Sequence, residues 1–244
     1  MIARRPVLLL AALAVAVALG ADAGKKDAKK DKDKDAKETK TPTSWYARSL
    51  VQSDAGIIVW DYWSKGRKLR AETIISGTPI VTYVSGEFYT IVDMVTQKGV
   101  AIRRSPEALA ADLSRANERP FGREGEDMIA KGAEFIRSEN LSERPTRLYR
   151  LTDDRGKTEV WVTDDKRKVP VRVIFFARDS GAKATTDYID WIADLPLADA
   201  FFEPDPRVEL ERVEYADYVK RSETGPVGPA PVLFANLLHG DKKK

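Results

Sequence analysis

Paired carboxylates are the residues of this chain best suited to acid–base chemistry or to binding a cation. The pairs are Asp153-Asp154, Asp164-Asp165, and Asp187 with Asp190. Neighbouring carboxylates can share a proton or bind Ca²⁺. The first two pairs fall between predicted strands, however, where Asp is common because it hydrogen bonds to the nearby backbone. We therefore interpret them as turn residues rather than as a catalytic couple.

Histidine and cysteine chemistry is almost excluded by composition. The single His is His239, close to the C-terminus, and the chain has no Cys. A His general base, a His metal site, a Cys nucleophile and a disulfide are therefore all excluded from the predicted domain. No Gly-rich phosphate loop follows a strand and opens a helix. The sequence predicts a protein that is not an enzyme and that needs no cofactor or metal.

Bulky apolar residues occupy both faces of several predicted strands. Residues 57–63 and residues 171–176 are apolar or aromatic at consecutive positions. A sheet with one face in water would carry polar residues at alternate positions. Either both faces are buried as core, or a strongly curved sheet holds an apolar pocket. The pattern alone favours core, because buried aromatic residues are usually core.

Two groups of strands flank a helical insert in the predicted domain, residues 44–221. Turn residues separate strands at 56–63, 67–75, 80–84, 87–92, 100–103, 146–152, 157–163, 169–177 and 182–192, with a last extended segment over 208–215. Ser105-Pro106 can start one helix and helical spacing predicts a second over 125–138, so the insert is 105–138. Nine or ten strands against two helices predict a mainly β, or α+β, domain.

The N-terminus has the pattern of a secretory signal peptide. Arg4 and Arg5 precede an apolar run, and Ala21-Asp22-Ala23 follows as a cleavage site, so residues 1–23 are predicted to be removed. The run spans positions 7–19, which is 13 residues, fewer than the roughly 20 that a membrane-spanning helix needs. We therefore predict a periplasmic protein with no transmembrane anchor in its mature form.

Charged segments surround the predicted domain. Residues 25–40 hold eight Lys against five acids and residues 241–244 hold three Lys against one, so together they contribute +5. The chain carries +3 in total and +2 without the signal peptide, which leaves the part between these segments near −3. Nucleic-acid binding, which needs a basic face on the fold, is therefore disfavoured. Residues 24–43 are predicted to be a disordered linker, and residues 222–244 a Pro- and Gly-rich tail that is mobile or loosely docked.

The arrangement resembles the outer-membrane lipoprotein carrier (LolA-like) superfamily over about residues 50–215. The matching motifs are KGRKLRAE at 65–72, GTPIVTYVSGEFYTIVD at 77–93, TEVWV at 158–162 and PVR at 170–172. The resemblance implies an unclosed antiparallel β-barrel, a curved sheet whose concave face is covered by the helical insert. It also implies an apolar cavity for acyl chains, with Arg70 near it, and so favours the pocket interpretation of the doubly apolar strands.

Three functions are considered for this sequence. The first is a periplasmic carrier or chaperone that binds lipid or lipoprotein acyl chains. The second is an interaction or sensory module of the same fold that binds an envelope protein or lipid cue. The third, a hydrolase built on an acid pair, is disfavoured by the missing His and by the turn positions.

Strand alternation and helix spacing give a predicted cavity lining, to which the resemblance adds Arg70. The members from alternation and spacing are Trp60, Tyr62, Tyr83, Phe88, Leu109, Leu113, Ile129, Ile136, Trp161 and Phe176. A slip of one residue would move a whole strand's set to the opposite face. The insert is expected to act as a lid over the cavity, with a permanent plug as the alternative.

Overall fold

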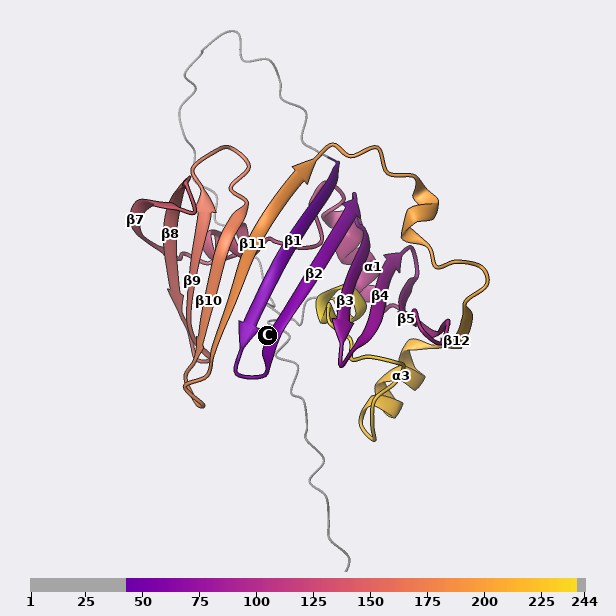
Figure 1. The fold of residues 1–244 in the computed structure, drawn as a ribbon. Helices are drawn as coiled ribbons and strands as arrows, with labels where there is room; N and C mark the ends of the chain where they lie inside the picture. Colours follow the sequence, from indigo (N-terminus) through magenta and orange to yellow (C-terminus); the bar gives the residue numbers. More distant parts are fainter. Residues whose placement is uncertain (1–42, 241–244) are drawn as a thin grey trace, which may run out of the picture.

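The computed structural model describes residues 43–240, and its main feature is one open, twisted sheet (Figure 1). The predicted signal peptide and nearly all of the predicted linker lie outside the described residues. The sheet has twelve strands in the order β12-β6-β5-β4-β3-β2-β1-β11-β10-β9-β8-β7. The strands are β1 Ser44–Ser53, β2 Gly56–Lys65, β3 Lys68–Ile75, β4 Thr78–Ser85, β5 Phe88–Asp93, β6 Lys98–Arg103, β7 Glu134–Leu141, β8 Arg144–Thr152, β9 Gly156–Thr163, β10 Pro170–Ala177, β11 Lys183–Ala193 and β12 Glu209–Val213. The predicted mainly β, unclosed architecture is confirmed.

Strand β1 joins the two halves of the sheet. It pairs antiparallel with β2 on one side and with β11 on the other, so the strands before and after the insert form one continuous surface. The other neighbours are antiparallel except β12, which runs parallel to β6. The sequence prediction placed strands at the positions of β2 to β6 and β8 to β11 but missed β1, whose polar residues hide its alternation.

The helices are α1 Pro106–Ser114, α2 Glu124–Ala130, α3 Tyr215–Ser222 and α4 Ala235–His239, with a short 3₁₀ helix η1 at Asp199–Phe202. The Ser105 side chain caps α1 by accepting a hydrogen bond from the backbone N–H of Ala108, as its position before Pro106 predicted. Tyr215 begins α3 and is not part of the last strand. None of the helices in residues 43–240 has both the length and the apolar character that crossing a bilayer requires.

The predicted second helix, 125–138, is wrong beyond residue 130. Gly132 has a φ of +84° and ends the helix, with Gly132 N–H bonded to the Ile129 carbonyl and Ala133 N–H to the Met128 carbonyl. This is the Schellman arrangement, in which a glycine at positive φ closes the last helical turn. The chain then continues as edge strand β7. The insert is therefore two short helices, and Ile136 belongs to a strand.

The main hydrophobic core lies on one face of the sheet, which we call the inner face; the opposite face is the outer face. The insert and the C-terminal segment, residues 225–240, both pack on the inner face, and α1 and the yellow C-terminal helix lie behind β2 and β3 in Figure 1. Leu237 and Leu238 are fully buried in that core. The prediction of a mobile or loosely docked tail is therefore wrong for residues 225–240.

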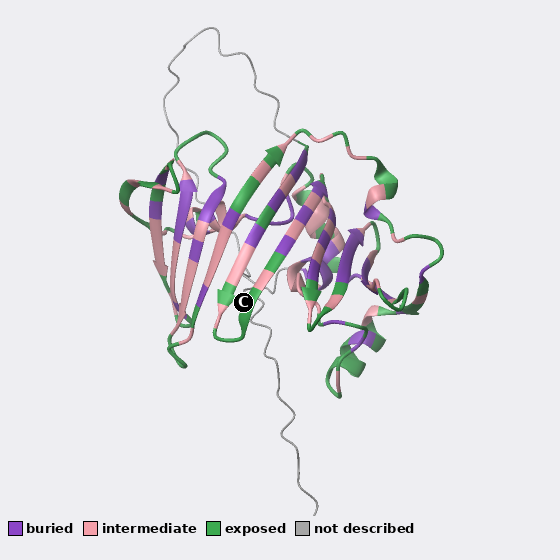
Figure 2. Cartoon of the chain, viewed as in Figure 1, coloured by how far each residue is buried: buried purple, intermediate pink, exposed green. Residues whose placement is uncertain are grey.

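The outer face is also covered in part, by the chain between β11 and β12. Phe202 of η1 is fully buried, and Val208 packs with Val81, Tyr83 and Val92 of the outer face. Strand β4 is consequently buried at five consecutive positions, as its unbroken purple stretch in Figure 2 shows. Two covered faces explain why the apolar pattern of this strand does not alternate.

Candidate functional site

A row of mostly apolar side chains crosses the inner face from β2 to β7. Register pairs Ile58 with Val51, Val51 with Thr186, Thr186 with Val173, Val173 with Val160, Val160 with Tyr149, and Tyr149 with Phe135. Val160 and Val173 are buried, but Ile58, Val51 and Tyr149 stay half-buried, and Phe135 at the sheet edge is 51% exposed. The row is therefore an extension of the core that remains partly open to solvent.

A second inner-face row lies next to the first, closer to the turns that join β8 to β9 and β10 to β11. Leu151 pairs with Thr158, Thr158 with Phe175, and Phe175 with Ala184. Leu151 and Phe175 are both half-buried. We call the two rows together the open rows. Partly exposed apolar side chains at this density, six of them across two adjacent rows, are the feature expected of a site for an apolar ligand.

An aromatic cluster covered by other parts of the chain continues the open rows along β2. Trp60 and Tyr62 lie on the inner face, two and four residues after Ile58, and both are buried. Phe121 of the insert stacks on Tyr62 with ring centroids 5.1 Å apart. Phe234 of the C-terminal segment stands edge-on to Trp60 and to Tyr62, at 6.1 Å from each. Ligand access to this cluster would require one of these covers to move.

The C-terminal segment is held by isolated hydrogen bonds, most of them from side chains, rather than by strand pairing. The buried Tyr89 hydroxyl accepts hydrogen bonds from the backbone N–H groups of Leu233 and Phe234, at 3.1 and 3.2 Å. Arg104 donates to the Leu237 carbonyl at 2.6 Å, and the Ser105 N–H donates to the Leu238 carbonyl at 2.9 Å. The segment thus lies across the sheet as a largely irregular chain with one short helix.

A polar group sits under the aromatic cluster. The Tyr188 hydroxyl donates to Glu124 at 2.9 Å, and the Ser49 hydroxyl donates to the Tyr62 hydroxyl at 3.2 Å. Burial raises the pKa of the Glu124 carboxyl above its usual range, and burial raises the pKa of the Tyr62 hydroxyl. The other Glu124 oxygen is buried and has no hydrogen-bond partner among the described residues. These hydroxyl and carboxyl groups hydrogen bond to one another inside the core, and none of them points to the open rows as a nucleophile.

The predicted cavity lining is only partly brought together. Trp60 and Tyr62 lie on the inner face as expected. Tyr83 and Trp161 belong to separate clusters on the outer face, and Ile136 packs beside Trp161. On the helices, Leu109 is half-buried, Ile129 is half-buried, and Leu113 is 84% exposed and contacts no cavity. The face assigned to these strands was wrong by one residue, because the outer face carries its own covered aromatics.

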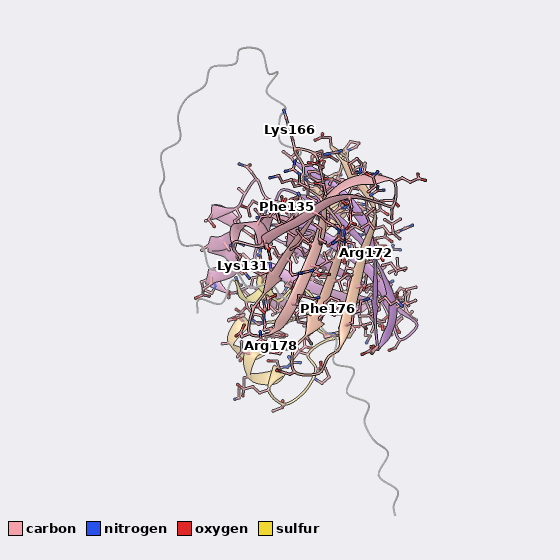
Figure 3. The ribbon with its side chains drawn as sticks, turned by 90° about the vertical axis from the view of Figure 1, so that its left-hand side faces the viewer. Lys131, Phe135, Lys166, Arg172, Phe176 and Arg178 are labelled. Atoms are coloured by element: carbon pink, nitrogen blue, oxygen red, sulfur yellow. The ribbon has the colours of Figure 1, made fainter. Side chains whose placement is uncertain are left out.

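Arg70, Phe88 and Phe176 also point to the outer face. Arg70 lies over the ring of Phe201, with its guanidinium carbon 4.4 Å from the ring centroid, and donates to Glu72. Phe88 pairs across β5 and β6 with Arg103. Phe176 lies under Lys157, whose Nζ is 4.2 Å from the ring centroid, and Figure 3 shows it on β10 well separated from Phe135. The expectation of Arg70 near the inner cavity is wrong.

Acidic pairs behave as the turn interpretation predicted. Asp153 accepts hydrogen bonds from the backbone N–H groups of Arg155 and Gly156, and Asp165 accepts from those of Arg167 and Lys168. Partial burial opposes ionisation of both carboxyls, but side-chain hydrogen bonds from Arg155 to Asp153 and from Thr163 to Asp165, together with these backbone hydrogen bonds, outweigh it and lower their pKa values. Asp187 forms an ion pair with Arg172.

The single histidine lies in the C-terminal segment. His239 lies on α4 and shares a hydrogen bond of 2.9 Å with the Tyr215 hydroxyl. Across residues 43–240, no three His, Asp or Glu side chains are grouped so that they could hold a metal ion.

A separate hollow of ≈ 450 Å³ lies at the β12 edge, beside α3. Its lining is polar and charged, and includes Arg212, Asp217, Lys220 and Arg221. Arg221 is already paired with Glu211 at 2.6 Å. The hollow is remote from the open rows and is a solvated surface feature.

Sequence reasoning missed the residues of the open rows. Ile58, Tyr149, Leu151 and Phe175 lie in predicted strands and Val51 lies in the missed strand β1, and none of them was assigned to the cavity. The signal that could have found them is the spacing along β2, where Ile58, Trp60 and Tyr62 share one face.

The backbone of this chain was compared with those of solved structures. Neither a protein-family model nor a curated protein matches the chain. An uncharacterized conserved protein from Thermus thermophilus superposes with a TM-score of 0.49 and 12% identity, over 70% of this chain and 91% of that one. A structure of the Pseudomonas aeruginosa MucA/MucB complex gives 0.44 and 9%, over 70% and 58%. A domain from Vibrio parahaemolyticus assigned as an outer membrane lipoprotein-sorting protein gives 0.31 and 12%, over 66% and 88%. These values identify neither a family nor a ligand for this chain.

Proposed function

We propose that this protein is an exported, non-enzymatic carrier that binds the acyl chains of lipids or lipoproteins on the inner face of its sheet. The observation that carries the proposal is the pair of open rows, in which apolar side chains on neighbouring strands remain partly exposed beside a fully formed core. Two adjacent rows of a sheet lie about 7 Å apart along the strands, wide enough for one extended hydrocarbon chain.

Ligand chemistry follows from the side chains of the open rows. Apart from the Thr186 and Thr158 hydroxyls and the Tyr149 phenol, the rows offer methyl, methylene and aromatic groups. Such a surface favours a chain that has no hydrogen-bond donors to satisfy. Each buried CH₂ contributes about 0.8 kcal/mol, so a chain of ten or more carbons gains enough to bind without a polar anchor.

Binding of cis-parinaric acid, whose fluorescence rises in an apolar environment, tests the proposal. Ile58→Glu places a charge in the first open row and should weaken binding at least tenfold. Ile57→Glu is the matched control, because Ile57 is the preceding residue of β2, is 63% exposed and points to the outer face. Equal binding by both variants, or no binding by the unmodified protein, would contradict the proposal.

A protein partner is the second candidate, and the edge strand β7 favours it. This strand pairs only with β8, so one side of its backbone is open to a further strand along the described residues. If the function is binding of an envelope protein through this edge, Ser138→Pro should abolish that interaction and leave parinaric acid binding unchanged.

A further inference from the structure

We infer that the C-terminal segment, residues 225–240, is a built-in occupant of the apolar binding face, and that a long acyl chain displaces it. This inference rests on the proposed function and adds how the site is regulated. The covered aromatic cluster then becomes the inner end of the same site, and the open rows are its entrance.

The open rows and the covered aromatic cluster form one continuous surface. Ile58 belongs to the open rows, and Trp60 and Tyr62 follow on the same face of β2. Phe234 of the segment ends the exposed part by covering both aromatic rings. A hydrocarbon chain that enters along the open rows therefore meets Phe234 and must either stop there or replace it.

The segment itself resembles an apolar chain. It buries Val227, Ala230, Leu237 and Leu238, and its Val232, Leu233 and Phe234 pack against the same core. Pro226, Pro229 and Pro231 lack an N–H, so this stretch asks for few hydrogen bonds from the sheet. A face that accepts this sequence in an irregular conformation is also complementary to an acyl chain.

The segment is attached to the inner face without strand pairing. Its hydrogen-bond partners are single groups, namely the Tyr89 hydroxyl, the Arg104 guanidinium, the Ser105 N–H and the Tyr215 hydroxyl, and no strand of the described sheet pairs with it. Residues 223 and 224, which connect it to α3, are exposed. The segment can consequently leave the face by rotation at this exposed connection, without opening the sheet.

Displacement has a cost that sets the affinity. The segment competes with the ligand, so the apparent dissociation constant is the intrinsic one divided by the fraction of molecules with an uncovered face. Short chains that fill only the open rows escape this competition. The protein should therefore discriminate by chain length, with long chains coupled to release of the segment.

A disulfide that pins the far end of the segment tests the inference. The chain has no Cys, and a Cβ built on Gly240 would lie 2.8 Å from the Cβ of Glu107. It would lie equally close to the backbone atoms Glu107 C and Ala108 N, at a φ of +75°, so Gly240→Cys itself moves the chain end in both the oxidised and the reduced form. A shift of about 1 Å brings the two Cβ atoms into the range of a disulfide. In Glu107→Cys/Gly240→Cys, the oxidised protein should bind cis-parinaric acid at least tenfold more weakly than the same protein after reduction.

The outcomes are distinguishable. Equal binding by the oxidised and reduced forms would overturn the displacement and leave the open rows as the whole site. Absence of binding in both forms and in the unmodified protein would overturn the proposed function together with this inference. Phe234→Ala gives an independent check, because it loosens the cover without a cross-link and should tighten binding several-fold; unchanged or weaker binding would count against displacement.

Discussion

The Tyr188 hydroxyl donates a hydrogen bond of 2.9 Å to the carboxyl of Glu124, and this contact joins the insert to the inner face of β11. The second carboxyl oxygen of Glu124 is buried with no partner among the described residues. Burial in this position raises the pKa of Glu124 above its ordinary value of 4.5.

Glu124→Gln is predicted to stabilise the protein at neutral pH. A carboxyl with a raised pKa in the folded state favours folding below pH 4.5, and this advantage is lost as the pH rises through the raised pKa. Gln keeps an oxygen for Tyr188 and carries no charge, so the gain should be about 1 kcal/mol at pH 8. Urea unfolding of both proteins at pH 4.5 and pH 8 measures it. A difference that does not grow with pH would contradict the prediction.

Tyr89→Phe is predicted to weaken the attachment of the C-terminal segment. The lost hydroxyl accepts two backbone hydrogen bonds, from Leu233 and Phe234, in a fully buried position. Leaving these donors unpaired should lower the free energy of unfolding by about 2 kcal/mol. Tyr83→Phe, on the outer face of the adjacent strand, is the control and should change it little. The two variants can be compared in one denaturant titration series, where equal effects would argue against a specific role of the Tyr89 hydroxyl.

Asp112→Asn is predicted to loosen α1. Asp112 bridges the buried Arg104 at 2.6 Å and Arg67 at 3.0 Å, and only 1% of the Arg104 side chain is exposed. Removing the shared charge leaves two arginines beside a neutral amide, at a cost of about 3 kcal/mol. Thermal unfolding of the variant should show a large fall in Tm. Glu209→Gln breaks the exposed pair with Lys98 and should leave Tm nearly unchanged, since such pairs contribute little.

The strand positions could be predicted because turns depend on local sequence. Gly66 and Gly86 each adopt a φ of +55° at a hairpin turn, a conformation that glycine adopts without strain. The N–H groups at the Asp153 and Asp165 turns are likewise satisfied by the nearest carboxylate. Turn signals of this kind need no knowledge of the tertiary fold.

Strand faces could not be predicted in the same way. Strand β4 is buried at Ile80 and at Tyr83, on opposite faces, because the core covers one side and the chain around η1 covers the other. Alternation carries no information where both faces are apolar. The role of residues 225–240 was missed for a related reason: a Pro- and Gly-rich stretch predicts irregular backbone, but irregular backbone can still lie in a core.

Hydrogen exchange separates two elements that could uncover the site, the insert and the C-terminal segment. The sequence favoured the insert, residues 105–138, as the lid. In the structure α1 is tied by Asp112, and α2 presses so closely on β9 that a Cβ on Gly125 would lie 2.3 Å from Val162. Residues 232–238 are instead held to the sheet by side-chain hydrogen bonds from Tyr89 and Arg104 and by apolar packing.

Residues 232–238 can leave the sheet by movement at the exposed connection after α3, whereas α2 is held at both ends between α1 and β7, so we predict that amides of residues 232–238 exchange faster than those of α2 in the protein without ligand. Adding a saturating long-chain fatty acid should speed exchange in residues 232–238 further and leave α2 unchanged, because the ligand takes the place of the segment on the inner face. If α2 instead becomes more protected while residues 232–238 do not change, the insert is the lid and the C-terminal segment is a permanent part of the core.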